Sequence, residues 1–139
     1  MELIANALQT VASNQNVLFT DTAVKGNCSI SHRDGSGLVS LRGITSQCRA
    51  RYKVSFGANV AIPAGGTVAP ISLAIAVAGE AIGGTTMIST PTAAEAFNNI
   101  FSAVYLDIPA GCCYTISVVN LTDADIDVQN ANLIVERVA

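Results

Sequence analysis

The single histidine of this chain lies close to residues that could complete a catalytic triad. Ser29, Ser31 and Asp34 all stand within three positions of His32, and serine, histidine and aspartate are the residue types that together activate a hydroxyl nucleophile. Known triads, however, are assembled from distant chain segments, and the GxSxG turn that presents the serine of many hydrolases does not occur in this sequence. The sequence therefore predicts that His32 is an ordinary polar residue of a strand or turn, and that the protein is not an enzyme.

The cysteines are Cys28, Cys48, Cys112 and Cys113. Their spacing does not fit a zinc site, because no CxxC pair occurs and only one histidine is present. Free cysteine is among the residue types most often found buried, so we expect small buried side chains, with a Cys28–Cys48 disulfide as the alternative. A bond between the adjacent Cys112 and Cys113 would be strained. We expect no metal, no cofactor and no redox role.

Three aspartates have the spacing with which some calcium loops begin, namely Asp123, Asp125 and Asp127. Such a loop would need glycine where Val128 stands and a bidentate carboxylate where Ile134 stands. The sequence thus favours a solvated acidic turn that leads into a strand.

The basic residues are concentrated in one place. Arg49, Arg51 and Lys53 alternate along the chain, so they line one face of one strand. They are candidates for contact with an acidic partner surface, and the alternative is a solvated face or the rim of an interface. The net charge of -3, the pI of about 4.8 and the lack of aromatic residues among these cations argue against binding to nucleic acid.

These residues would be positioned by β-strands, because period-two alternation and turn residues dominate the sequence. The clearest strand covers 49–62, and others are expected near 17–20, 27–32, 38–42, 70–78, 85–90, 97–108, 113–120 and 126–138. The stretch 3–11 fits either a helix or a strand, and we favour a strand because the surrounding pattern is β. We expect about eight or nine strands in a two-sheet antiparallel jelly-roll sandwich, an all-β fold that forms a single domain over residues 1–139.

Alternation also separates an inner from an outer face. Seven side chains are expected inside the sandwich: Tyr52, Val54, Phe56, Val104, Leu106, Ile116 and Val118. Phe101, Ala103 and Tyr105 are apolar on the opposite face of their strand, and we expect them at a subunit interface. The alternate positions in 70–78 are mostly alanines, a face suited to close packing by another layer.

The composition indicates that much of the surface of this protein is buried in contacts with other chains. Charged residues make up 12% of the chain, about half the usual share, while 50% of residues are hydrophobic. The apolar stretch 68–77 is about half as long as a membrane-spanning helix. We therefore expect contact with copies of the same chain or with a larger body. No secretory signal is visible at the start, so we expect synthesis in a cytoplasm.

Three runs, NVLFTDT at 16–22, YKVSF at 52–56 and QNANLIVER at 129–137, give the chain a resemblance to the tumour-necrosis-factor-like jelly-roll domains of Gram-positive bacteria and their phages. That group includes small phage virion proteins and the heads of spore-surface collagen-like proteins. The resemblance covers nearly the whole chain, and it implies a jelly roll that trimerises around a threefold axis. No collagen-like stalk precedes the domain in this sequence, and its aromatic residues are few for the family.

The resulting hypothesis is a non-enzymatic homotrimer that decorates a bacteriophage capsid. Its partners would be itself and the major capsid protein, on the outside of a virion assembled in the bacterial cytoplasm, with no nucleic acid bound and no insertion into a membrane. The alternative is a receptor- or glycan-binding head of a phage fibre or a spore or cell-surface protein. Exposed aromatic residues on loops would favour that alternative, and this chain has no tryptophan.

Overall fold

The computed structural model describes all 139 residues and contains twelve β-strands and one short 3₁₀ helix. The strands are β1 (Glu2–Ala5), β2 (Gln9–Val11), β3 (Asp21–Val24), β4 (Ile30–His32), β5 (Val39–Arg42), β6 (Arg49–Ala61), β7 (Ile71–Val77), β8 (Glu80–Ala81), β9 (Met87–Ser89), β10 (Asn98–Pro109), β11 (Cys113–Asn120) and β12 (Ile126–Arg137). The 3₁₀ helix η1 covers Gly83–Thr85. No helix is of the length and apolarity that crossing a membrane requires.

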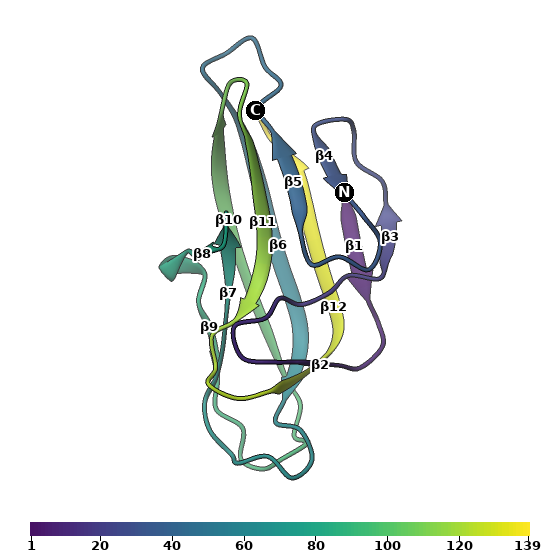
Figure 1. Cartoon of the computed structure of the whole chain (residues 1–139), viewed down its shortest axis with the longest axis vertical. Helices are drawn as coiled ribbons and strands as arrows, with labels where there is room; N and C mark the ends of the chain where they lie inside the picture. Colours follow the sequence, from purple (N-terminus) through teal and green to yellow (C-terminus); the bar gives the residue numbers. More distant parts are fainter.

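The strands form two antiparallel sheets that face each other (Figure 1). Sheet A has the order β10-β6-β12-β1-β3, and β2 pairs with β12. Sheet B has the order β4-β5-β11-β7-β8, and β9 pairs with β7. The predicted all-β jelly-roll sandwich is confirmed. The number of strands exceeds the expected eight or nine because the stretch 3–11 forms two strands, β1 and β2, and because the two-residue β8 is too brief to show alternation. The strand expected at 17–20 is wrong, since β3 begins only at Asp21.

The core fills the space between the sheets with 28 buried residues in one cluster. Five of the seven predicted core residues are fully buried: Tyr52, Val54, Phe56, Ile116 and Val118. The other two, Val104 and Leu106, are only partly buried although they pack against the core. Both lie on β10, which is an edge strand of sheet A and is therefore covered by a neighbouring strand on one side only.

One hydrogen bond connects the two layers, and an aromatic pair packs within the core. The rings of Phe19 and Phe56 meet edge to face, with centroids 6.2 Å apart. The buried Tyr52 of sheet A donates its hydroxyl proton to the carbonyl of Arg42 in sheet B at 2.7 Å. A buried tyrosine needs such a partner, because an unpaired hydroxyl would cost free energy.

The prediction that the cysteines are buried is wrong, since all four are free and exposed. Cys28 and Cys112 lie in turns, Cys48 lies just before β6, and Cys113 is the first residue of β11. Turns run over the surface, because their backbone groups need water or capping partners, and this outweighs the general tendency of cysteine to be buried. The loop before β6 and the β10–β11 turn meet at the upper end of Figure 1, near the C-terminus.

The alanine face predicted for β7 also differs from expectation. Ala74 and Ala76 are buried within the single chain, so no further layer is needed to cover them. Ser117 and Val119 of β11 lie directly opposite these two alanines, and η1 packs along the other edge of β7.

Candidate functional site

The two sets of surface residues predicted from the sequence lie on one face. In the pairing of β10 with β6, Tyr105 stands opposite Lys53 and Ala103 opposite Ser55, while Asp107 stands opposite Arg51. Positions in register point to the same side of a sheet, so the apolar trio on β10 and the basic trio on β6 share the outer face of sheet A. The sequence analysis predicted two separate surfaces, a subunit interface and a docking surface. Alternation shows which side chains of one strand share a face, but it does not show which strands become neighbours.

The centre of this face is apolar and exposed. Phe101 has 65% of its surface exposed and Tyr105 has 62%, and Ile134 on β12 adds a third large apolar side chain at 40%. Ala103 and Gly57 have small side chains or none, so the surface between the two aromatic rings projects little from the sheet. We call this group, Phe101, Ala103, Tyr105, Ile134 and Gly57, the apolar centre. The alternation within 126–138 could have identified Ile134 as an outward residue, but its place opposite Ser55, in the same row as Ala103, depends on the pairing of β12 with β6 and of β6 with β10.

One end of the face carries a charged cluster that the sequence reading did not find. Asp107 accepts hydrogen bonds from Nε and a terminal nitrogen of Arg51 at 2.8 and 3.1 Å, and its carboxylate lies 3.2 Å from Nε of Arg49. The bonds from Arg51 hold the pKa of Asp107 below its usual range and raise the pKa of Arg51. Two of the three predicted docking cations are therefore paired within the chain, and Lys53 makes no ion pair.

The other end of the face carries a row of asparagines across three strands. The side chain of Asn99 on β10 donates to Asn59 on β6 at 3.2 Å, and Asn59 donates to Asn130 on β12 at 3.3 Å. Asn130 adopts a left-handed conformation with φ 54° at the bulge in the β12–β6 pairing. Polar groups thus lie beyond both ends of the apolar centre.

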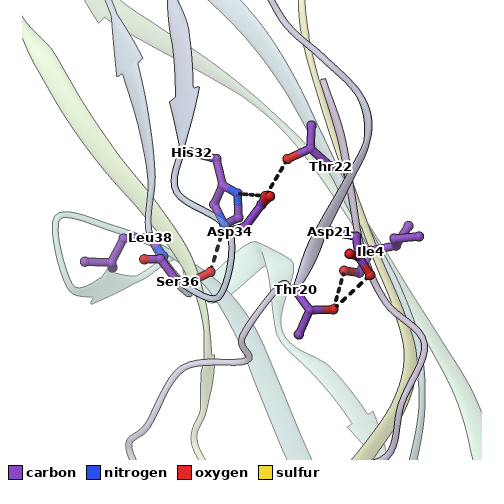
Figure 2. Close-up of polar contacts among 8 residues, drawn as sticks. All are labelled: Ile4, Thr20, Asp21, Thr22, His32, Asp34, Ser36 and Leu38. Carbon is purple, nitrogen blue, oxygen red and sulfur yellow. Dashed lines mark hydrogen bonds and ion pairs between the residues drawn. The ribbon is translucent and has the colours of Figure 1, made fainter.

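His32 lies away from this face, in a polar cluster that connects β3, β4 and the turn after β4 (Figure 2). Its side chain is fully buried, its Nε2 is 2.8 Å from the carbonyl oxygen of Ser36, and its Nδ1 is 3.8 Å from Asp34. Asp34 also accepts a hydrogen bond from Thr22 at 2.8 Å. Because a carbonyl oxygen accepts, Nε2 carries the proton and donates it.

The cluster does not assemble the triad considered from the sequence. No serine hydroxyl bonds to the imidazole, because the hydroxyl of Ser29 bonds to Asn27 and Ser31 is exposed on β4. The ring also meets Phe19 edge to face at 6.4 Å. These contacts give His32 a structural role, which is to hold the turn after β4 against the sandwich. The third aspartate of the acidic turn, Asp127, is likewise used structurally, since it accepts from Thr10 at 2.9 Å.

No protein-family model matches the sequence. The search of curated proteins also gives no match. Solved structures do match in fold. The globular domain of the zebrafish complement 1qA protein aligns over 96% of this chain and 93% of its own, with 11% identity and a TM-score of 0.64.

Two further solved structures agree with this result. Murine APRIL aligns over 95% of this chain and 96% of its own, with 11% identity and a TM-score of 0.62. Eiger TNF from S. frugiperda aligns over 100% and 92%, with 14% identity and a TM-score of 0.66. The chain therefore has the jelly-roll fold of tumour-necrosis-factor-like and complement 1q-like domains.

Proposed function

We propose that this chain is a non-enzymatic structural protein that assembles into a homotrimer through the outer face of sheet A. The observation that supports this most strongly is the arrangement of that face, which has an apolar centre and polar groups at both ends. Stable interfaces between subunits have a desolvated apolar core and a polar rim. Large exposed apolar patches on a folded chain commonly mark such contacts.

The edge of sheet A supports the same proposal. β10 is a twelve-residue strand with no partner on its outer side, and it contributes Phe101 and Tyr105 to the apolar centre. A long, apolar edge strand invites uncontrolled pairing unless something covers it. A closed ring of three copies would bury both the edge strand and the face. The surface area buried in such an obligate interface would be on the order of 2,000 Å². The low share of charged residues in the chain agrees with this amount of contact.

We further propose that the trimer decorates the outside of a bacteriophage capsid and binds the major capsid protein there. The support is the sparse charge, which suits a surface covered by other protein, together with the resemblance to small virion proteins. A trimer that engages three equivalent lattice points would gain avidity of roughly 10²–10⁴ over a single contact. In this arrangement the Arg49–Asp107–Arg51 cluster and Lys53 form the rim of the trimer, and Lys53 is the free cation for an acidic partner surface.

Light scattering on the purified protein tests the trimer. The expected mass is about three times the 14.3 kDa of one chain, and a stable monomer at micromolar concentration would contradict the proposal. Phe101→Glu places a charge in the apolar centre and should give folded monomers. Ile88→Glu is the matched control, because Ile88 is equally exposed at 68% but lies on β9 of the other sheet. It should leave the trimer intact.

Gene context and binding test the capsid role. The gene should lie beside genes for a portal, a protease and a major capsid protein, and the trimer should co-sediment with capsids from that phage that lack it. Binding should weaken with salt, and Lys53→Glu should weaken it further while the trimer persists. Lys25→Glu, on the loop after β3, is the control. A trimer that ignores these capsids and binds a host envelope instead would favour the alternative of a receptor-binding head.

A further inference from the structure

A groove crosses the outer face of sheet B, on the opposite side of the sandwich from the apolar centre. Its volume is about 450 Å³, within the range of small-molecule sites. Ala76 and Ser117, which pair across β7 and β11, form part of its floor. One wall is the segment between β2 and β3 with Asn14 and Asn16, and the β7–β8 turn lies at the other side. The groove therefore does not compete with a trimer formed through sheet A.

The polar groups in the groove have no partners in the chain. Ser117 as a whole residue is only 4% exposed, but its hydroxyl is not among the buried unsatisfied groups, so that hydroxyl is open to the groove. The hydroxyl of Thr115 and the side-chain amides of Asn14 and Asn16 are also unpaired and line the same space. These groups face the groove without partners in the chain, so they are available to bond to a molecule that enters it.

The wall that carries the two asparagines is held rigidly. The amide nitrogen of the buried Asn120 lies 3.1 and 3.2 Å from the carbonyl oxygens of Val11 and Ala12, just before this segment. The backbone N–H of Asn14 donates to the carbonyl of Asn120 at 2.9 Å. Asn16 forms a β-bridge with Val119 of β11. A site that is already ordered before binding loses less entropy when a ligand arrives.

The chemistry of the lining selects a class of ligand. No charged side chain lines the groove, which disfavours phosphates, nucleotides and other ionic ligands. Hydroxyls and primary amides both donate and accept, as the hydroxyls of a sugar do. The exposed Leu38 and the half-buried Val119 offer apolar contact for the C–H face of a ring, and the small floor residues let a ring approach the sheet.

From these observations we propose that the groove binds a neutral saccharide of one or two rings. Ser117 and Thr115 bond to its hydroxyls from below, and the amides of Asn14 and Asn16 bond from the side. This activity is additional to the structural role and does not depend on it, because no residue of the groove belongs to sheet A.

A ¹H–¹⁵N NMR titration of the full-length protein tests the proposal. The probes are glucose, galactose, mannose, N-acetylglucosamine and their disaccharides, with glucose 6-phosphate and sialic acid as charged comparisons. At least one neutral sugar should shift the side-chain amide signals of Asn14 and Asn16 and the backbone amide of Ser117. Absence of shifts with every neutral sugar, shifts at another surface, or shifts with the charged sugars alone would overturn the proposal.

Two substitutions connect the shifts to the groove. Ser117→Ala removes the hydroxyl without filling the space, and Thr115→Val replaces the other hydroxyl by a methyl group of similar size. Each should weaken binding about three- to tenfold, as the loss of one hydrogen bond does. Ser31→Ala, on β4 of the same sheet but outside the groove, is the control and should bind like the unchanged protein. Equal affinity of all three variants would overturn the assignment. Light scattering on the same samples reports on the trimer separately, so a failed trimer and a failed saccharide site are distinguishable.

Discussion

The ring of Phe101 lies against the backbone of Gly57, the residue directly opposite on the neighbouring strand. A Cβ atom at Gly57 would stand 3.5 Å from Cδ2 of Phe101, which is an ordinary van der Waals distance. An aromatic side chain that covers a glycine on an adjacent strand shields backbone that would otherwise be open. The pair lies in the middle of the apolar centre, where Gly57 keeps the surface low enough for close contact with another subunit.

This relationship predicts that Gly57 and Gly43 respond differently to the same change. Gly57→Ala adds a methyl group at a permitted distance, so the stability of the fold should stay equal or rise by about 0.5–1 kcal/mol. At Gly43 a Cβ would stand 2.1 Å from the carbonyl oxygen of Pro109, and the backbone would have to move. Gly43→Ala should cost about 1–3 kcal/mol. Urea unfolding of the two variants checks the difference, and an equal loss in both would contradict it.

Core and interface residues should also separate in their effects. Phe56→Ala leaves a cavity in the sandwich and should cost about 3–5 kcal/mol of unfolding free energy. Tyr105→Ala removes a residue that is 62% exposed, so the fold should remain. The trimer should be weaker, and it should dissociate at protein concentrations at which the unchanged protein is still trimeric. Circular dichroism follows the fold and light scattering follows the mass. If both variants lost fold and assembly to the same degree, the division between core and interface would be wrong.

The charged cluster predicts a defined pH dependence. Hydrogen bonds from Arg51, helped by the charges of Arg51 and Arg49, lower the pKa of Asp107 below the usual 3.8. A lowered pKa means that the folded state binds this proton less readily than the unfolded state. The stabilisation is therefore complete above the usual value and declines as pH falls through the lowered one.

A ¹³C NMR titration of the Asp107 carboxyl group can measure this effect. Its midpoint should lie below 3.8 in the unchanged protein and should rise toward that value in Arg51→Gln, which keeps a similar length but loses the charge. Lys25→Gln removes a cation elsewhere and should leave the midpoint in place. A midpoint that did not respond to Arg51→Gln would show that the pairing is absent in solution.

The exposed cysteines should react in the folded protein. A thiol reagent such as 5,5′-dithiobis(2-nitrobenzoate) should modify all four under native conditions, with the same count after unfolding in guanidinium. Replacing Cys112 and Cys113 by serine should leave fold and assembly unchanged, because neither side chain fills the core. Protection of any thiol until the protein unfolds would contradict their exposure, and zinc bound in stoichiometric amounts would contradict the absence of a metal role.

Several properties could be predicted from the sequence because they depend on neighbours along one strand. Alternation with a period of two places Tyr52, Val54 and Phe56 inside and Lys53 outside, and the structure agrees. The same reasoning placed Phe101 and Tyr105 on the outer face of their strand. The all-β sandwich follows from enough such strands, since each has one apolar face that only another layer can cover.

Other properties were decided by pairing between distant segments, which no local pattern contains. The register of β10 with β6 places Asp107 beside Arg51 and brings the predicted interface and docking residues onto one face. The edge position of β10 leaves Val104 half-covered. The groove over Ser117 exists because Asn120 ties a segment more than 100 residues earlier in the chain to the end of β11. Alternation assigns a side chain to one face of its strand, but strand order and register determine which side chains meet across the sheet, and these depend on the free energy of the whole packed sandwich.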